Sequence, residues 1–278
     1  MKSSKFFRRL GLLLVLLFLF MLALTVIYPF LWMIISSFKD NTELYLSPWS
    51  LPGEWRWGNF ASAWNAGIGN YFLNSLFVTS VSTVFSILFS AMAAYPLSRY
   101  RFRLRKACLV FLICGLMLAP QVALIPLYKL LQLLGLYNTY LAMIVPYVAY
   151  RIPFTAFLFW SHMLTLPKEI EDSARIDGCG FLGVFWNVVL PLSKPILFTG
   201  VLLAVRTIWN EFMFALVFTE SSRISTIPLG LMALKGDTFS SYPTLIAGLL
   251  ITCLPMIILF LALQKQFVRG LTEGGVKG

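Results

Sequence analysis

Six long apolar runs dominate this chain of 278 residues and restrict what it can fold into. They cover about 10–37, 72–97, 107–128, 139–160, 196–218 and 243–263. A run of about 18 or more apolar residues is long enough to cross a bilayer as a helix. Hydrophobic residues make up 59% and charged residues only 12%, whereas soluble domains carry about 25% charged residues. We therefore predict an all-α integral membrane protein with six transmembrane helices, and no segment is long enough for a soluble domain.

The first run follows Lys2, Lys5, Arg8 and Arg9, an arrangement that secretory signals also have. The apolar part of a signal is about 7–15 residues long and ends at small residues. Here the apolar run continues through "LGLLLVLLFLFMLALTVIYPFLWMII". We interpret it as an uncleaved membrane anchor.

Lysine and arginine are concentrated in alternate segments of the chain. Of the 22 such residues, 15 lie in the N-terminal segment, the segments after the second and fourth runs, and the C-terminal segment. Because positively charged residues in short loops are retained in the cytoplasm, we predict that both termini are cytoplasmic. This bias accounts for the net charge of +11, which suits an anionic inner leaflet and does not indicate nucleic-acid binding.

Groups that could carry out chemistry are few. Cys108, Cys114 and Cys253 lie in apolar runs, Cys179 lies in a polar loop, and the sequence has no CxxC, so it predicts neither a disulfide framework nor a zinc site. We interpret the single histidine, His162, as an interfacial side chain at a helix end. The sequence has no GxxxxGK[ST] phosphate loop and no clustered nucleophile and base. We expect no catalytic residues, cofactor or metal in this chain.

The longest predicted cytoplasmic loop covers residues 161–195 and contains "LPKEIEDSARIDGCGFLGVFWNVVLPLSKP". Thr165 is a suitable N-cap, and Glu169 and Glu171 lie near the positive end of a helix dipole. Gly178 and Gly180 offer a left-handed stop, after which "FLGVFWNVV" predicts a second helical piece. We expect two short helices that meet at a glycine corner against the inner membrane surface and present a docking surface.

This loop resembles the EAA loop of ABC-importer permeases, whose pattern is E-A-A, three residues, G, nine residues, I, one residue, L-P. The matching residues are Asp172, Ser173, Ala174, Gly178, Val188, Leu190 and Pro191. Three of them differ conservatively from the pattern, with Asp for Glu, Ser for Ala and Val for Ile. The stretch "LPKEIEDSARIDG", which adds Glu169 and Asp177 to the candidate coupling surface, is similar to the carbohydrate branch of the family. The alternative is an ordinary amphipathic loop helix.

Other stretches resemble the same family along nearly the whole chain. They are "SFKDNTELYLSP", "YFLNSLFVTS", "AAYPLSRYRF", "IWNEF" and "FVRGLTEGGVKG". Together they are similar to the shorter, six-span permease of maltose-transporter type importers. The resemblance implies that residues 1–278 form a single permease domain in the inner or plasma membrane of a prokaryote.

The resemblance also implies partners. In that family a second, related permease completes the pathway, and a dimer of ABC ATPases, which binds ATP and Mg, receives the coupling loop of each permease. An extracytoplasmic sugar-binding protein would dock on outer surfaces such as 38–71 and 219–242. The tail, with Gly274, Gly275 and Lys277, would reach the ATPase interface.

Ionisable and polar groups within the spans are candidates for the substrate pathway, because they are costly in a bilayer. They are Arg151, Arg206, Asn210 and Glu211. Arg206 and Asn210 share a helix face, whereas Glu211 points about 140° away from Arg206, so we expect no direct ion pair. Asn210 and Glu211 could bind sugar hydroxyls. Alternatively, these groups bind backbone or the partner permease.

Other functions remain open at this point. The imported compound could be a sugar, a polyol, a sugar phosphate or a non-sugar. A stand-alone secondary carrier would need its coupling groups and an internal repeat within one chain, and the six runs show no such repeat.

Overall fold

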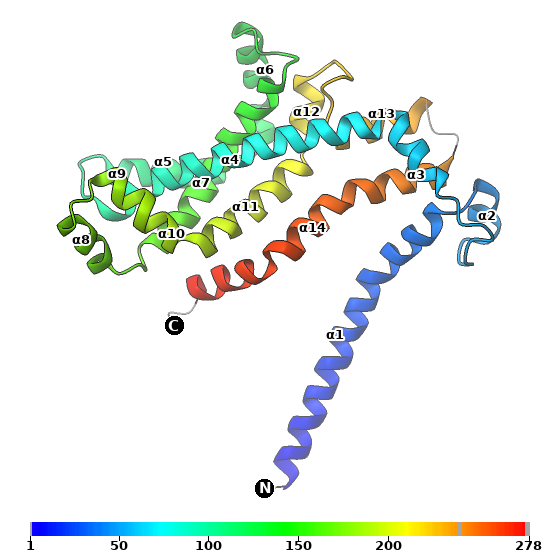
Figure 1. Ribbon diagram of the computed structural model, residues 1–278, viewed down its shortest axis with the longest axis horizontal. Helices are drawn as coiled ribbons and strands as arrows, with labels where there is room; N and C mark the ends of the chain where they lie inside the picture. Colours follow the sequence, from blue (N-terminus) through cyan, green and yellow to red (C-terminus); the bar gives the residue numbers. More distant parts are fainter. Residues whose placement is uncertain (1, 238–240, 276–278) are drawn as a thin grey trace. The chain divides into compact units, whose positions relative to one another are not determined.

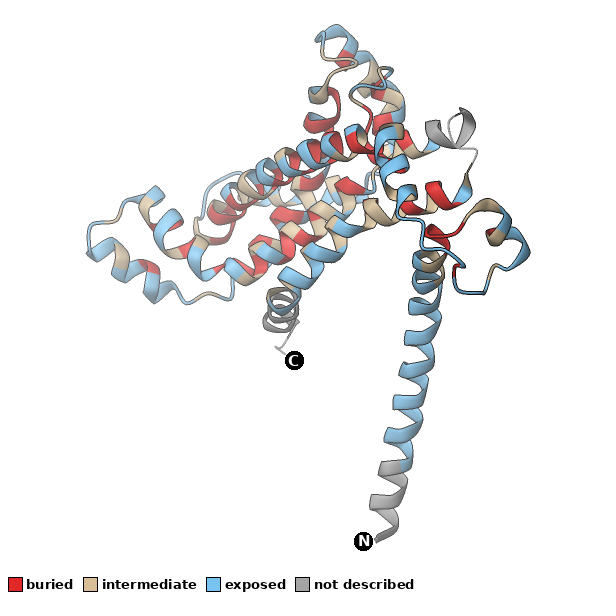
Figure 2. Cartoon of the chain, turned by 45° about the vertical axis from the view of Figure 1, so that its right-hand side comes forward, coloured by how far each residue is buried: buried red, intermediate tan, exposed pale blue. Residues whose placement is uncertain are grey.

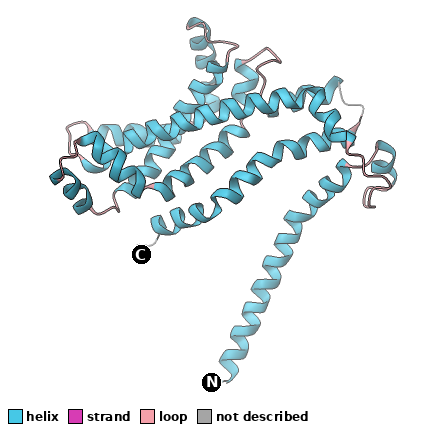
Figure 3. Cartoon of the chain, viewed as in Figure 1, coloured by secondary structure: helices cyan, strands magenta, loops and turns pink. Residues whose placement is uncertain are grey.

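The computed structural model describes the backbone of residues 2–237 and 241–275, and the side chains of residues 10–232 and 241–266. Within these ranges every regular element is a helix (Figure 3). The elements are α1 (Lys2–Ser37), α2 (Asn41–Leu46), α3 (Gly58–Ala63), η1 (Trp64–Ile68), α4 (Gly69–Arg99), α5 (Arg105–Met117), η2 (Pro120–Ala123), α6 (Leu124–Leu133), α7 (Tyr140–Met163), α8 (Lys168–Ile176), α9 (Phe181–Val184), η3 (Phe185–Val189), α10 (Leu190–Leu192), α11 (Lys194–Trp209), α12 (Met213–Phe218), α13 (Ile227–Asp237) and α14 (Tyr242–Gly275).

Four helical stretches of the described chain are long and apolar enough to cross a membrane. They are Leu10–Ser37, Gly58–Arg99, Tyr140–Met163 and Tyr242–Gln266. These stretches contain the first, second, fourth and sixth apolar runs of the sequence. The all-α fold that the sequence predicts is therefore the fold of the described residues.

The third and fifth apolar runs do not form continuous helices. In the third, Arg105–Met117 and Pro120–Leu133 meet at 95°. Ala119 is extended (φ −70°, ψ 132°), as expected for a residue that precedes a proline. The expected helix over 107–128 is thus broken. In the fifth run, α11 ends at Trp209 and α12 begins only at Met213.

A second bend precedes α11, where Phe181–Leu192 and Lys194–Trp209 meet at 78°. Pro195 lies in the first turn of α11, where its missing N–H costs no helical hydrogen bond. If each bent pair counts as one span, the described chain has up to six spans.

The chain divides into two compact units, which are described separately. Unit 1 comprises Met1–Ile68 with Leu234–Cys253, and unit 2 comprises Gly69–Ala233 with Leu254–Gly278. In unit 1, every α1 side chain from Leu10 to Leu31 is exposed (Figure 2). A helix that is apolar all round and uncovered within its own unit is suited to contact with lipid or with another membrane helix.

The segment that follows α1 is ordered by polar contacts. Lys39 is fully buried, and its Nζ donates to the carbonyl oxygens of Ser47 (2.8 Å) and Pro48 (3.2 Å). Asp40 caps α2 by accepting from the backbone N–H of Glu43 at 2.7 Å. These bonds hold residues 39–48 in a fixed turn.

Unit 2 is built around α4, α7 and α11, with α4 lying along α7 and α11 packed against both (Figure 1). The face of α4 in this core carries small hydroxyl side chains, and Ser82, Ser86 and Ser90 are all fully buried. Small residues let membrane helices approach closely. On α11, a Cβ at Gly200 would lie 2.8 Å from the Phe159 ring of α7, so only glycine fits at this contact.

Candidate functional site

The loop between α7 and α11 forms the two short helical pieces that the sequence predicts, α8 and the α9–η3–α10 segment. Two local expectations were wrong. Pro167, and not Thr165, is the N-cap of α8, since the Thr165 hydroxyl donates to the His162 carbonyl at 2.8 Å instead. Gly180 has φ −71° and is not left-handed. Its extended backbone begins α9.

Gly178 makes the corner between the two pieces. Its φ is +88°, a left-handed value that confirms the predicted glycine stop. The N–H of Cys179 donates to the Ala174 carbonyl and the N–H of Gly178 to the Arg175 carbonyl, both at 3.0 Å. This pair of bonds is the Schellman motif, which satisfies the last free carbonyls of α8.

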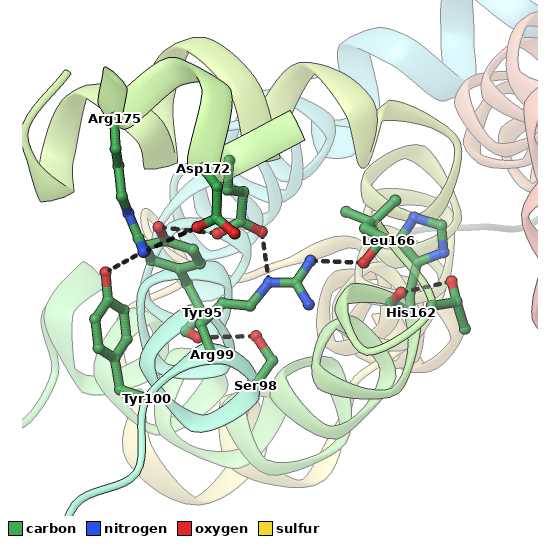
Figure 4. A network of polar contacts seen from close by, with 10 residues as sticks. Tyr95, Ser98, Arg99, Tyr100, His162, Leu166, Asp172 and Arg175 are labelled. Atoms are coloured by element: carbon green, nitrogen blue, oxygen red, sulfur yellow. Dashed lines mark hydrogen bonds and ion pairs between the residues drawn. The ribbon is translucent and has the colours of Figure 1, made fainter. Parts of the chain in front are cut away.

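A buried ion pair fastens α8 to the end of α4 (Figure 4). Arg99 Nε donates to Glu171 Oε1, and the two side chains are only 4% and 5% exposed. Arg99 Nη2 also donates to the Leu166 carbonyl at 3.1 Å. The Tyr95 hydroxyl lies 3.4 Å from the other Glu171 oxygen. Removing one partner of such a pair would leave an uncompensated buried charge.

Aromatic rings surround this ion pair. Tyr95 is 1% exposed and contacts Phe181 and Phe185 at ring-centroid distances of 5.1 Å and 5.3 Å. Tyr100 accepts from Arg175 Nη2 at 3.0 Å, and the Arg175 guanidinium lies 5.7 Å from the centre of its ring. Both helical pieces of the loop are therefore tied to one end of α4, the end for which the charge pattern predicts a cytoplasmic position.

The outward face of the loop is unusual for an amphipathic helix. An ordinary surface helix buries its aliphatic residues and exposes its acids. Here Glu171 is buried at 3% exposure, whereas Ile176 is 87% exposed and Leu182, across the glycine corner, is 60% exposed. Two large apolar side chains exposed on either side of one corner give the loop an apolar surface that could serve as a docking site.

The sequence-predicted loop residues divide between this outward face and the interior. Glu169, Asp172, Ser173, Asp177, Gly178 and Pro191 are exposed. Ala174, Val188 and Leu190 are partly buried and pack on the cluster around Tyr95. Asp172 lies 3.4 Å from Arg175 in an exposed pair, which contributes at most about 1 kcal/mol.

The structure brings two of the four predicted pathway residues together. Arg151 of α7 and Glu211, between α11 and α12, line one cavity of about 180 Å³ in unit 2. Glu211 Oε2 accepts from the Tyr147 hydroxyl at 2.6 Å, and its Oε1 accepts from the backbone N–H of Phe214 at 2.9 Å. Glu211 thus satisfies the backbone N–H of Phe214, which lies in the first turn of α12 and has no helical partner.

Arg206 and Asn210 do not line this cavity. Both are exposed, and the Asn210 amide donates to the Arg206 carbonyl at 2.8 Å, one turn back along α11. Arg206 has no ion pair within the described residues, in agreement with the expectation that it does not pair with Glu211. The tail that is predicted to reach the ATPase is only partly described. Gly274 and Gly275 end α14, and Lys277 is outside the described residues.

Residues 86–273, which include the loop, the ion pair and the cavity, match the family described as "Binding-protein-dependent transport system inner membrane component". The chain belongs to this family of membrane permeases. Permeases of this family are transport components and not enzymes, and they lie in the inner membrane of prokaryotes. This match confirms the family that the loop motif and the other quoted stretches resemble.

Individual permeases agree with this assignment. The chain is 49% identical to the "Probable ABC transporter permease protein YurM" of Bacillus subtilis over 261 residues, 94% of this chain and 87% of YurM. It is 36% identical to the "Melibiose/raffinose/stachyose import permease protein MelC" of the same organism over 252 residues, 90% of this chain and 91% of MelC. A chain of a bacterial ABC transporter for the acidic polysaccharide alginate has the same fold, with a TM-score of 0.81 at 23% identity over 94% of this chain and 97% of that one.

Sequence reasoning missed the residues that anchor the loop of this permease. Arg99 was a member of a basic cluster, and Glu171 was a favourable charge in the first turn of a helix. Their pairing joins positions 72 residues apart, which no local pattern reveals. The available signal was that Arg99 is the first of the five basic residues after the second span, and that an acid lies within the loop motif two spans later.

Proposed function

We propose that this permease and a second, related permease form the translocation pathway of an importer for a sugar. The sugar assignment is supported by the name of MelC, which imports three oligosaccharides and aligns with 90% of this chain. Partner ATPases, which bind ATP and Mg, supply the energy, because the sequence of this chain has no phosphate-binding loop.

The observation that carries the mechanism is that the loop buries one acid, Glu171, and exposes two large apolar side chains, Ile176 of α8 and Leu182 of α9. Ile176 and Leu182 face outward and would enter a cleft on the ATPase, while Glu171 faces inward and holds the helix to Arg99. A displacement of α8 by the ATPase therefore acts on the end of α4 through a buried ion pair. Closure of the ATPase dimer would move the spans between inward-open and outward-open arrangements around a central site.

We propose that this loop and both termini are cytoplasmic. The support is the charge count, in which the segment after the second span alone carries five Lys and Arg between Arg99 and Lys106. The same orientation places Gly274, Gly275 and Lys277 on the side of the ATPases, where the tail would contact them.

On the opposite side, an extracytoplasmic binding protein would dock on 38–71 and 219–242. The family description includes dependence on a binding protein. Both surfaces are held by polar contacts within their own units. In unit 1, Arg56 pairs with Asp40 at 2.8 Å. In unit 2, the Asn138 side chain accepts from the N–H groups of Glu220 (3.0 Å) and Ser221 (2.9 Å).

Two measurements test this function. The first is the uptake of labelled mono-, di- and trisaccharides by cells with and without this chain, where we expect deletion to abolish uptake of at least one sugar. Loss of uptake of a peptide or an ion alone would contradict the sugar assignment.

The second is purification of the chain from its native membrane, which should bring a second permease and an ATPase with it. Ile176→Asp should reduce ATPase retention, because it places a charge in the proposed cleft. Leu46→Asp is the matched control, because Leu46 is similarly exposed (79%, against 87% for Ile176) but belongs to residues 38–71, which we propose to be extracytoplasmic. Equal ATPase retention by the two variants would contradict the docking surface.

A further inference from the structure

The cavity of about 180 Å³ in unit 2 lies where the helical pattern of the spans is broken. Pro120 and Gln121, at the 95° bend between α5 and α6, contribute to its wall. Glu211 contributes from the break between α11 and α12. Irregular backbone within a membrane protein occurs where it is buried in protein or lines a polar cavity. In transporters such breaks commonly mark ligand sites.

Arg151 is the group in this cavity whose bonding is incomplete. The residue is 8% exposed, and Nη1 donates to the Thr207 hydroxyl at 3.3 Å. Its Nε and Nη2 have no hydrogen-bond partner among the described residues. These two nitrogens form one edge of the guanidinium and can donate two parallel hydrogen bonds to a pair of oxygens. A buried charged donor left unpaired is costly, but both nitrogens are almost completely covered, so the Arg151 side chain must turn toward the cavity before this edge can bind a ligand.

The rest of the lining restricts the chemistry of that ligand. The Glu211 carboxylate balances the Arg151 charge and would repel a second anion brought into the cavity. Tyr147 and Tyr150 add two aromatic rings to the wall. An Arg and a carboxylate can bind the oxygens and the hydrogens of hydroxyl groups, and aromatic rings cover the apolar face of a sugar ring. The volume is that of a single ring.

We propose that this cavity is a subsite for one neutral, hydroxylated sugar ring and that this permease subunit therefore contacts the substrate directly. Once the Arg151 side chain has turned its free edge toward the cavity, this edge would bind two neighbouring hydroxyls, and Glu211 would accept from a third. The proposal rests on the sugar-import function proposed above. It adds where the substrate binds in this chain and that the substrate is uncharged.

Uptake by Arg151 variants tests the subsite. The labelled panel should contain neutral mono-, di- and trisaccharides together with glucuronate and glucose 6-phosphate. Arg151→Gln should reduce uptake of the neutral substrate about ten- to a hundredfold, as expected for lost bonds to a charged donor. Arg151→Lys should restore part of it. The ATPase stimulation by the binding protein should persist in both variants, which separates substrate contact from assembly.

A second measurement detects the ligand at the cavity itself. In the purified permease and ATPase complex without binding protein, the native cysteines are replaced and Met213, which lines the cavity, becomes Cys. The panel sugar whose uptake depends on this chain should slow the alkylation of Cys at 213. Leu133→Cys, exposed on α6 and outside the cavity, should react at the same rate with and without sugar. Adding Arg151→Gln should remove the protection at 213.

The outcomes separate the subsite from the function. If deletion of the chain leaves uptake of the whole panel unchanged, the sugar-import function fails and the subsite with it. If uptake depends on the chain but Arg151→Gln transports normally, or sugar gives no protection at 213, the subsite is overturned and the function stands. If protection and dependence on Arg151 are found only with an anionic panel member, the neutral assignment is overturned.

Discussion

Substitution of Gly178 tests whether the corner of the coupling loop determines ATPase docking. Gly178 has φ +88°, and a Cβ built there would meet no other atom within 4 Å. The cost of a side chain in this chain alone is therefore backbone strain and not a steric clash. Two hydrogen bonds, from Gly178 N to Arg175 O and from Cys179 N to Ala174 O, keep the backbone in this conformation.

The size of the effect follows from that geometry. A residue with a Cβ in the left-handed region costs roughly 1–2 kcal/mol. For Gly178→Ala this corresponds to roughly a five- to thirtyfold shift away from the docked loop conformation. Gly178→Asn should cost less, because Asn tolerates positive φ. Gly178→Val should cost most, because a β-branched residue is rarely found there and its side chain would point into the docking surface.

The assay compares these variants in the complete complex. Each is expressed with the second permease and the ATPases, solubilised, and measured for ATPase affinity and sugar uptake. Membrane insertion and pairing with the second permease should be normal in all of them. Gly180→Ala is the matched control, since Gly180 has φ −71° and open space around its Cβ position. Gly178→Val with the same ATPase affinity and uptake as Gly180→Ala would refute the proposed role of the corner.

Three further predictions concern the anchor, the topology and the energy source. Glu171→Gln leaves Arg99 buried and unpaired, and we expect a local loss of about 3–5 kcal/mol, seen as faster proteolysis of the loop and weaker ATPase retention. A double variant with Leu at 171 and Met at 99 should recover much of the protease resistance, and no recovery would contradict the ion-pair explanation. Cysteines replacing Tyr45 and Met232 should react with a membrane-impermeant reagent outside sealed cells, whereas one replacing Arg103 should not, and labelling at 103 would overturn the orientation. The purified single chain should not hydrolyse ATP, and hydrolysis that remains after every ATPase subunit is removed would contradict this expectation.

Elements with a strong local signal could be predicted from the sequence. The apolar runs that lie within α1, α4, α7 and α14 are long and continuous, so hydropathy alone places them. The corner at Gly178 could be predicted because a glycine directly after an amphipathic helix commonly takes positive φ. In each case the deciding information lies within a few turns of chain.

The bends and the anchor could not be predicted in the same way. Hydropathy reports how apolar a segment is and not the direction of the helix axis. The run over 107–128 is therefore predicted as one span, although the helices before and after Ala119 meet at 95°. Pro120 itself was a usable signal, because it forces the preceding residue out of the helical region. Acidic side chains are usually exposed, but Glu171 is buried because it pairs with Arg99 from another helix. A local sequence pattern does not reveal this pairing.

The small side chains between α4, α7 and α11 determine how stiff the core of unit 2 is. Ser86 and Ser90 on α4 and Gly200 on α11 are small and let neighbouring groups lie close to the helix backbones, and these residues have few rotamers that could change. An interface of long side chains would absorb an applied displacement by rotamer changes. Here Ser90 contacts the α7 backbone and Gly200 lets the Phe159 ring lie against the α11 backbone, so we expect a force applied to the end of α4 to move the three helices together. Enlarging a buried serine on α4 should push these helices apart, and we expect it to lower both stability and transport.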